Sequence, residues 1–296
     1  MKEKSIGLFE FQKQFGKEED CEQAIVKARW PKGFVCPKCN HDDGYRLRTK
    51  RAIQCAVCRH QISITAGTIF HNTRISLVNW FWMIYQIASD KRGVSALRLS
   101  KELGMYYRTV WHILHKIRRS MSGRDNSVIR LAGLIELDQG YFGGKHRKTQ
   151  VLVAIEQEGK KKAGNLVMKK IFGKLVSEPE VKRIVEAHID NESQQHFVTD
   201  CASAHETLRK MGHKLENHLS TPETAAKKLP LVHLAISLAK TFILGTYHGV
   251  SKKHLQNYLD EFCYRFNRRP KENQLHESLI RACILAAPIN YAALRL

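Results

Sequence analysis

A carboxylate inside an apolar strand is the first group in this sequence that could do chemistry. In the segment LIELD at residues 134–138, Ile135 and Leu137 alternate with Glu136 and Asp138, which is the period of a half-buried strand. Burying a carboxylate alone is costly, so Asp138 needs a hydrogen bond, an ion pair or a bound cation. Hydrogen bonds to amides of the glycine-containing turn that follows are the simplest alternative to a cation.

Three groups downstream could complete a site around Asp138. A short strand at residues 197–200 ends in Asp200, and a helix beyond it carries both His233 and Lys240. The last two are seven residues apart, or two helical turns, so they lie on one face about 10 Å apart. Two neighbouring carboxylates repel one another unless they share a cation. Divalent metals about 3.5–4 Å apart could activate the attacking oxygen and stabilise the leaving oxygen of an in-line phosphoryl transfer.

Four cysteines form a second candidate metal site. They are arranged as two CxxC pairs with fifteen residues between them, namely Cys36, Cys39, Cys55 and Cys58. A short hairpin between two such turns directs four thiolates to one tetrahedral ion, so the spacing predicts a zinc ribbon. All four positions are filled by sulfur, which makes the zinc structural and its binding, about 10–16 kcal/mol, a contribution to folding. Four unrelated buried cysteines are the alternative.

The apolar periodicity predicts an α/β fold that brings Asp138 and Asp200 together. Strands and helices alternate in this part of the chain, with strands at 134–138, 149–156, 166–172, 197–200 and 214–219 and helices at 177–189 and 203–211. Three consecutive strands, a crossover helix and a returning strand match the ribonuclease-H-like arrangement, a mixed sheet flanked by helices. The first and fourth strands are neighbours in that fold, so the two aspartates would stand close despite 62 residues of separation.

The segments before this fold are predicted to be largely helical around the zinc ribbon, with helices over 1–30, 76–89, 94–103 and 106–120. The last two flank Gly104 and form a helix-turn-helix pattern, whose second helix can enter a major groove. The residues expected to face bases or phosphates are Tyr106, Tyr107, Arg108, Thr109, His112 and Lys116. A small helical bundle that links two domains is the alternative, and residues 121–127 are the predicted linker.

The charge balance indicates a polyanionic partner. The 296 residues carry a formal net charge of +21 with 43% apolar residues, which favours a folded protein that binds nucleic acid over a generally basic protein. A basic cluster on the final helices, expected to neutralise phosphates, comprises Lys252, Lys253, Arg265, Arg268 and Arg269. The sequence has no run of about 20 apolar residues and no apolar core of a signal peptide, so we expect no membrane partner and a cytoplasmic location.

Several short segments also match those of a known family in order, at 28–31, 36–39, 66–71, 136–138, 141–145, 199–200, 245–248, 251–255, 258–262 and 265–269. On these segments residues 8–270 resemble bacterial insertion-sequence transposases that join a zinc ribbon and a helix-turn-helix to a DDE-type ribonuclease-H-like domain. The resemblance implies an N-terminal helix and zinc ribbon at 1–74, a helix-turn-helix segment at 75–128 and a catalytic domain with basic C-terminal helices at 129–296.

The resemblance also implies roles for the candidate residues. Asp138 and Asp200 match the first two metal ligands, and Lys240 matches a lysine that faces DNA phosphate. The third ligand is usually glutamate or asparagine, but His233 occupies that position. Magnesium prefers oxygen ligands whereas manganese tolerates nitrogen, so we expect manganese to support activity at least as well as magnesium. A decayed helix in an impaired enzyme is the alternative, and two neighbouring positions also depart from the family, with Ile236 for tryptophan and Thr241 for arginine.

The implied activity is metal-dependent cleavage and strand transfer of double-stranded DNA. The partners would be the terminal inverted repeats of the element and the target DNA, bound by a homodimer or larger assembly in the bacterial nucleoid. One rival hypothesis is a catalytically decayed DNA-binding protein that represses its element. Another is a structure-selective nuclease that needs no particular end sequence.

Overall fold

A computed structural model describes residues 6–47, 50–144, 148–159, 162–173, 175–200, 202–218, 225–290 and 294. The chain divides into two compact units, one formed by residues 1–123 and 271–296 and the other by residues 124–270. Residues 271–296, which the sequence assigned to the catalytic domain, thus group with the N-terminal unit. There α11 (Leu275–Leu285) packs against α2 (Glu18–Arg29) and α3 (Leu77–Ser89).

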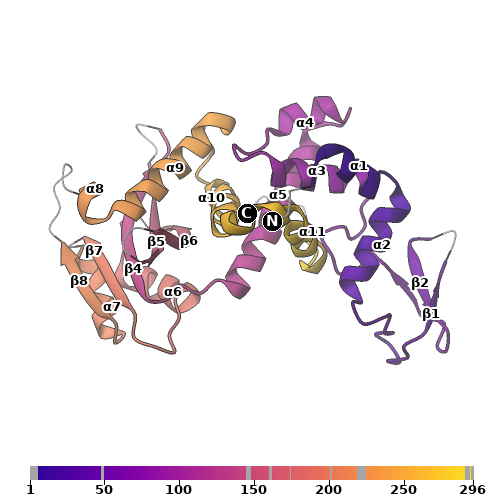
Figure 1. The fold of residues 1–296 in the computed structure, drawn as a ribbon, viewed down its shortest axis with the longest axis horizontal. Coiled ribbons are helices and arrows are strands. Elements are labelled where there is room, and N and C mark those ends of the chain that lie inside the picture. Colours follow the sequence, from indigo (N-terminus) through magenta and orange to yellow (C-terminus); the bar gives the residue numbers. More distant parts are fainter. Residues whose placement is uncertain are drawn as a thin grey trace. The chain divides into compact units, whose positions relative to one another are not determined.

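The first unit contains a small sheet and a set of helices (Figure 1). α1 (Leu8–Phe15) and α2 divide the predicted N-terminal helix, of which residues 1–5 lie outside the described part. β1 (Gly44–Arg46), β2 (Ala52–Cys55) and β3 (Gln61–Ser63) form an antiparallel sheet in that order. Glu18 of α2 binds Arg51 of the sheet and accepts a 2.8 Å hydrogen bond from the Leu77 amide of α3, so one carboxylate links three elements.

The predicted helix-turn-helix segment is present as α4 (Ala96–Glu102) and α5 (Tyr107–Val128). Ser95 caps α4 by accepting the amide of Arg98, and Gly104 in the turn has a φ of 60°, which favours glycine. The predicted linker at 121–127 contains the division between the two units, after Gly123, but it is helical, because α5 continues through it to Val128. Asp125 in this last turn forms a 2.7 Å ion pair with Arg268, a contact between distant segments that local sequence signals do not reveal.

The second unit is built on a five-stranded mixed sheet. Its strands are β4 (Leu134–Phe142), β5 (Thr149–Glu158), β6 (Lys162–Lys170), β7 (His196–Asp200) and β8 (Lys214–His218). The order is β6-β5-β4-β7-β8, with β4 antiparallel to β5 and parallel to β7. This is the predicted ribonuclease-H-like topology. The predicted last strand ended at residue 219, which lies outside the described residues.

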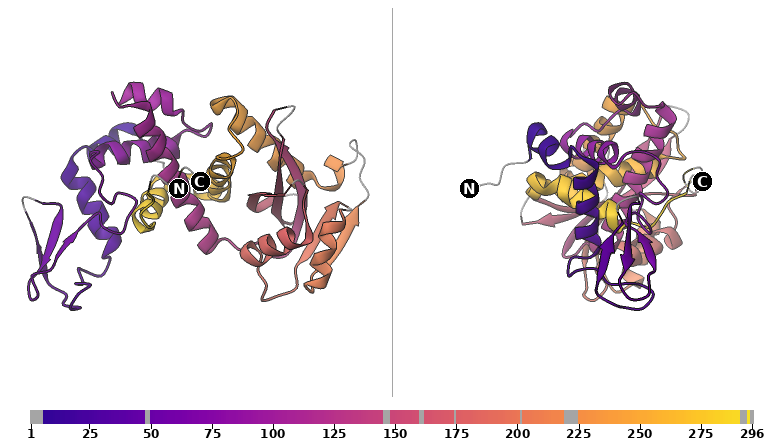
Figure 2. Two further views of the ribbon diagram at one scale, coloured as in Figure 1. Left: turned by 180° about the vertical axis from the view of Figure 1, so that it is seen from behind. Right: turned by 90° about the vertical axis from the view of Figure 1, so that its right-hand side faces the viewer.

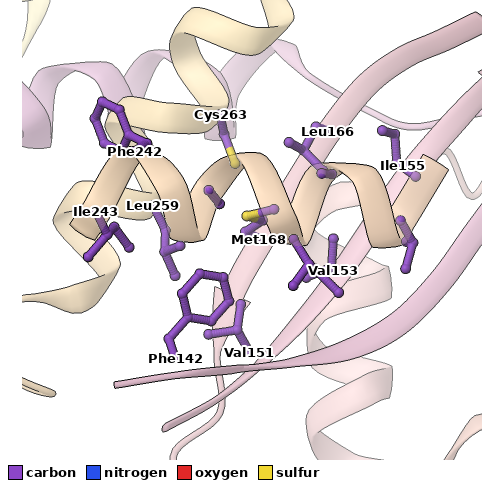
Figure 3. Close-up of a cluster of buried hydrophobic side chains, with 14 of the residues drawn as sticks. Phe142, Val151, Val153, Ile155, Leu166, Met168, Phe242, Ile243, Leu259 and Cys263 are labelled. Carbon is purple, nitrogen blue, oxygen red and sulfur yellow. The ribbon is translucent and has the colours of Figure 1, made fainter. Parts of the chain in front are cut away.

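Helices cover both faces of this sheet (Figures 1 and 2). One face packs against α6 (Glu178–His188), η1 (Ser203–Glu206) and α7 (Thr207–Lys210), with Leu137 and Phe197 in its core. The other face packs against α9 (Pro230–Tyr247) and α10 (Leu255–Asn267), with Val151 and Val153 in its core (Figure 3). The remaining short elements are α8 (Ala225–Lys228) and η2 (Arg269–Gln274).

Helix α9 is more apolar than the other helices of this unit. Within the described residues it alone is long and apolar enough to cross a membrane by length and composition, with a mean hydropathy of 1.2. Its buried residues include Val232, Ala235 and Ala239, which join the core between the sheet and α10. Only one side of the helix is buried in this way, since Leu234, Leu238 and Leu244 are exposed. It carries both His233 and Lys240 on one continuous helix, as predicted.

Candidate functional site

The two candidate aspartates lie on adjacent strands. Leu137 of β4 is paired with Thr199 of the parallel strand β7, and Asp138 and Asp200 each come one residue later. Asp138 follows the buried Leu137 on β4 and its side chain is 13% exposed, while that of Asp200 at the strand end is 33% exposed. The fold therefore brings together the two carboxylates that the sequence had paired.

Helix α9 supplies the third candidate ligand to the same place. Nε2 of His233 lies 3.4 Å from Oδ2 of Asp138. The other oxygen of Asp138, Oδ1, accepts a 2.6 Å hydrogen bond from the Gln139 amide. Nε2 of His233 is buried and has no hydrogen-bond partner among the described residues. A buried nitrogen without such a partner, beside a carboxylate oxygen, fits the donor set of a divalent cation.

A polar network that the sequence did not predict supports Asp200. Nδ1 of the fully buried His205 lies 3.0 Å from Oδ1 of Asp200. Nε2 of the same ring lies 3.4 Å from Nε2 of Gln139, and Gln139 in turn accepts a hydrogen bond from Gln150. If Gln139 donates to His205 Nε2, the imidazole carries its proton on Nδ1, which faces the aspartate. The network therefore restrains the Asp200 carboxylate through a fully buried histidine.

The two aspartates differ in their electrostatic environments. Burial and the negative charge of Asp200 raise the pKa of Asp138, outweighing the Gln139 amide and the charges of His233 and His205. Burial would also raise the pKa of Asp200, but the hydrogen bond and charge of His205 and the Ala202 amide lower it below its usual value. The charge of Asp200 disfavours ionisation of Asp138, as expected of two neighbouring carboxylates that could share a cation.

The candidate ligand atoms of Asp138, Asp200 and His233 do not all lie within 4.8 Å of one another. Within the described residues, only the four cysteines bring three or more candidate ligand atoms within 4.8 Å of one another. Asp138 and His233 are in contact, whereas Asp200 is engaged by His205.

Residues along α9 explain part of the departure from the family pattern. The β-carbon that a substitution would add at Gly140 lies only 3.2 Å from Cγ1 of Ile236, so the helix approaches the strand closely there. Thr241 donates its hydroxyl to the carbonyl of Ser237 and is exposed. Lys240 is exposed, with Nζ 5.9 Å from the ring centroid of Phe142. Lys240 can therefore reach a ligand lying over the end of β4.

The cysteine cluster has the geometry of a zinc site. Sγ of Cys36 lies 3.6 Å from that of Cys58, and Sγ of Cys39 lies 3.5 Å from that of Cys55. A tetrahedron with zinc–sulfur bonds of about 2.3 Å has edges of about 3.8 Å, so an ion fits among these atoms. Although burial opposes ionisation, the amides of Cys39 and Lys38 and the neighbouring thiols lower the pKa of Cys36 to about 6.

The two CxxC turns are built alike. The amide of Asn40 donates to the Cys36 carbonyl, and the amide of Arg59 donates to the Cys55 carbonyl. Asn40 and Arg59 both have a positive φ, 57° and 56°. Two equivalent turns, one from each side, are what a symmetric four-thiolate site needs, and the cluster fits a zinc ribbon.

The predicted DNA-contacting residues of α5 differ in exposure. Tyr106 and Tyr107 at its start are 88% and 51% exposed, and Arg108 is also exposed. Thr109, His112 and Lys116 are half-buried. Burial lowers the pKa of Lys116, whose Nζ lies 6.0 Å from the ring centroid of Trp80. The start of the helix is therefore more available to a ligand than its middle.

Two arginines of the predicted basic cluster have structural partners. Arg268 pairs with Asp125, and its Cζ lies 3.5 Å from the ring centroid of Tyr264. The Arg268 side chain is 17% exposed. Arg269 donates to the carbonyls of Ala163, Gly164 and Phe266. Their guanidinium groups join α10 to the rest of the second unit, and their contact with DNA stays a prediction. Lys252 and Lys253 are exposed, and Arg265 is half-buried.

Comparison with protein families identifies both domains. Residues 130–267 match the model of the ISXO2-like transposase domain, and residues 16–61 match that of the transposase zinc-ribbon domain. These ranges contain Asp138, Asp200 and His233 in the first case and all four cysteines in the second. No curated protein sequence matches the chain.

Two solved structures are similar to part of the chain. One is the Mos1 transposase catalytic domain with raltegravir and Mg, at 16% identity and a TM-score of 0.28 over 56% of this chain and 92% of that chain. The other is a chain of the simian T-cell lymphotropic virus intasome in complex with PP2A regulatory subunit B56 gamma, at 12% identity and a TM-score of 0.27. That match covers 52% of this chain and 56% of the intasome chain.

Proposed function

We propose that this chain, which carries the zinc ribbon and the transposase domain of IS1595-family transposases, cuts and joins DNA at the ends of an insertion sequence. The observation that carries the proposal is the meeting of Asp138 and Asp200 on adjacent parallel strands. The 3.4 Å distance between Nε2 of His233 on α9 and Oδ2 of Asp138 supports His233 as the third metal-binding side chain of the proposal.

Asp138, Asp200 and His233 are the residues that would hold magnesium or manganese. Such a cation activates the attacking oxygen and stabilises the leaving oxygen of phosphoryl transfer. The protein's own contribution is orientation: the Gln139 amide holds Asp138, and His205 holds Asp200. Lys240, exposed on the same helix as His233, is placed to bind a phosphate of the DNA strand.

Recognition of DNA is assigned to other parts of the chain. The exposed Tyr106, Tyr107 and Arg108 at the start of α5 are proposed to contact the terminal repeats. Lys252 and Lys253 are proposed to bind phosphates without regard to sequence, which makes affinity sensitive to salt. Two element ends must be held together for strand transfer, so we propose that a dimer or larger assembly is the active form.

The experiment that tests this function is cleavage of a labelled duplex bearing the element's terminal repeat, with magnesium or manganese. Wild type is compared with Asp138→Ala, Asp200→Ala and His233→Ala, and with Asp190→Asn as a control carboxylate elsewhere in the same unit. We expect nicking at the repeat boundary that needs a divalent metal, is supported by manganese at least as well as by magnesium, and is lost in the first three variants only.

The other outcomes separate the rival functions. Tight binding of the repeat without cleavage under either metal would indicate a DNA-binding protein whose third ligand has decayed. Cleavage of duplexes that lack the repeat, at the same rate, would indicate a structure-selective nuclease. Normal cutting by His233→Ala would remove His233 from the site while leaving the two aspartates in it.

A further inference from the structure

The first turn of α9 lacks a capping side chain of its own. The helix begins at Pro230, and the residue before it, Leu229, has no side chain that can accept a hydrogen bond. The first amides of a helix have no partner within the helix and need one when they are buried. Leu231 and Val232 in this turn are 6% and 0% exposed, so water cannot serve them well.

The missing cap comes from strand β4. Oε2 of Glu136 lies 2.9 Å from the amide nitrogen of Leu231 and 2.9 Å from that of Val232. Glu136 is 2% exposed, and it stands 95 residues before Leu231 in the chain. A negative charge at a helix N-terminus is favourable, and hydrogen bonds to an ionised acceptor are stronger than neutral ones. The contact therefore ties the beginning of α9 firmly to the strand.

The residue that follows these two amides is His233. Glu136 and Asp138 are two residues apart on β4, so their side chains project from the same face of the sheet. On the helix, Val232 and His233 are consecutive, and on the strand Glu136 and Asp138 are separated by one residue. A shift of the first turn of α9 would therefore move His233 relative to Asp138.

We infer that Glu136 is a positioning residue for His233: by capping the first turn of α9 it fixes the imidazole 3.4 Å from Asp138. The inference rests on the proposed function in so far as His233 is a metal ligand. It adds a residue that touches neither cation nor DNA and acts through the helix that it holds. Residues that orient a ligand in this way commonly affect metal affinity by about 10- to 100-fold.

A matched control is available on the neighbouring strand. Glu156 of β5 also accepts two backbone amides, from Ala132 at 2.9 Å and Asn165 at 2.7 Å. It lies next to Ile135 in the sheet, at the end of β4 that is away from Asp138. Its replacement should remove a comparable pair of hydrogen bonds without moving α9.

The experiment measures Mn²⁺ affinity of the full-length chain by electron paramagnetic resonance, together with hydrogen exchange of the Leu231 and Val232 amides. The variants are Glu136→Gln, Glu136→Ala, Glu156→Gln and Glu156→Ala, and each is also made with His233→Ala. We expect Glu136→Ala to weaken Mn²⁺ binding about 10- to 100-fold and to speed exchange of the two amides, with Glu136→Gln intermediate because its amide oxygen still accepts hydrogen bonds. Glu156→Ala and Glu156→Gln should each change Mn²⁺ affinity by less than about twofold.

The cycle with His233→Ala decides whether Glu136 acts through the histidine. If it does, replacing Glu136 changes Mn²⁺ affinity little once His233 is absent. An equal loss of affinity in both backgrounds, an equal loss in Glu156→Gln, unchanged amide exchange, or a wild-type chain that binds no Mn²⁺ would overturn the inference. Failure of the proposed function gives a different result, because a chain that binds Mn²⁺ as expected but does not cut repeat DNA contradicts only that proposal.

Discussion

Three alternate residues on one face of β4 each meet a different part of α9. Glu136 accepts the amides of the first turn, Asp138 faces His233, and Gly140 leaves room for Ile236. Each interaction uses a different property of the strand residue, namely charge, ligand chemistry and small size. Replacement of any one of them changes how closely the helix approaches the strand, so the geometry of the site depends on all three.

The contact at Gly140 gives a test that does not involve a charged group. A β-carbon there would lie 3.1 Å from Cε2 of Phe142 and 3.2 and 3.3 Å from two side-chain carbons of Ile236, closer than such carbons normally approach. We expect Gly140→Ala to push α9 from the strand, to lower the free energy of unfolding by about 1–3 kcal/mol and to slow repeat cleavage by more than tenfold.

The double variant with Ile236→Ala should recover at least fivefold of the lost cleavage rate, because it removes the α9 side chain that the new β-carbon meets, although the contact with Phe142 of β4 remains. Gly144→Ala is the control, since nothing lies within 4 Å of its added β-carbon. The measurements are single-turnover cleavage and urea unfolding. A Gly140→Ala enzyme that cuts normally would show that the approach of α9 to β4 does not set the reaction geometry.

At the scale of elements, helix α6 ends in a histidine that folding keeps neutral. His188 is 8% exposed, and burial, together with the positive charges of Lys169, Arg130 and Arg183, lowers its pKa to about 3. An unfolded chain restores a value near 6.5, so the unfolded state binds more protons between these two values. The contribution of His188 to stability is therefore complete above pH 6.5 and is lost as pH falls toward 3.

This sign predicts a specific change in the pH dependence of the second unit. Between pH 7.5 and pH 5, His188 should account for about 2 kcal/mol of lost stability, as an upper estimate. In His188→Asn the difference between the two pH values should shrink by up to that amount, measured by urea unfolding followed by circular dichroism. Replacing the exposed His248, also in the second unit, by asparagine should leave the difference unchanged. The same pH dependence in wild type and His188→Asn would contradict the buried-histidine explanation.

Elements whose signals are local were predictable from the sequence. The alternation of apolar residues located β4, and the order of strands and crossover helix placed Asp138 beside Asp200. Side-chain contacts that neither periodicity nor the order of strands determines were not predictable. Asp125 and a nearby glycine indicated a linker, yet Asp125 lies in the continuous helix α5 and forms an ion pair with Arg268 at the end of α10. Local composition gives no indication of such a pair.

The same limit applies to the functional residues. The sequence suggested that Arg268 and Arg269 are exposed cations, because several of the groups that bind them, including the Asp125 carboxylate and the Gly164 carbonyl, come from segments over 100 residues away. His205 was missed because one histidine in a short helical segment has no periodic or spacing signal. The only available indication was its position five residues after Asp200. Residues that act by orienting a ligand therefore needed the three-dimensional contacts to be found.

At the scale of the whole chain, the two compact units differ in what stabilises them. The second unit has two extended apolar clusters, one on each face of its sheet. In contrast, the buried cluster of the ribbon consists of Cys36, Cys55 and Ile62, two of which are candidate zinc ligands. The strands of this small sheet bury few other side chains, Ala52 and Ile53 among them, so its folding should depend on zinc.

The ribbon is also joined to the helices of the first unit. Arg46 and Arg51 pair with Glu22 and Glu18 of α2, and Arg29 of α2 donates to the carbonyls of Ser63 and Ile64. Glu18 in turn caps α3, so unfolding of the ribbon removes partners from both helices. Loss of zinc is therefore expected to weaken the whole first unit and to leave the second unit intact.

The distribution of tryptophan makes this difference measurable. All four tryptophans, at positions 30, 80, 82 and 111, lie in the first unit, so their fluorescence reports its unfolding alone. We expect zinc chelation, or Cys39→Ser, to lower the fluorescence-detected melting temperature by more than 10 °C, because the zinc-binding energy of about 10–16 kcal/mol is lost. Cys263→Ala, which removes a cysteine of the second unit, should retain one zinc per chain and the native fluorescence transition.

Exchange of the β4 and β5 amides should stay slow after chelation, since the sheet draws its stability from its own apolar layers. Parallel loss of protection in both units would show instead that zinc stabilises the chain as a single cooperative structure.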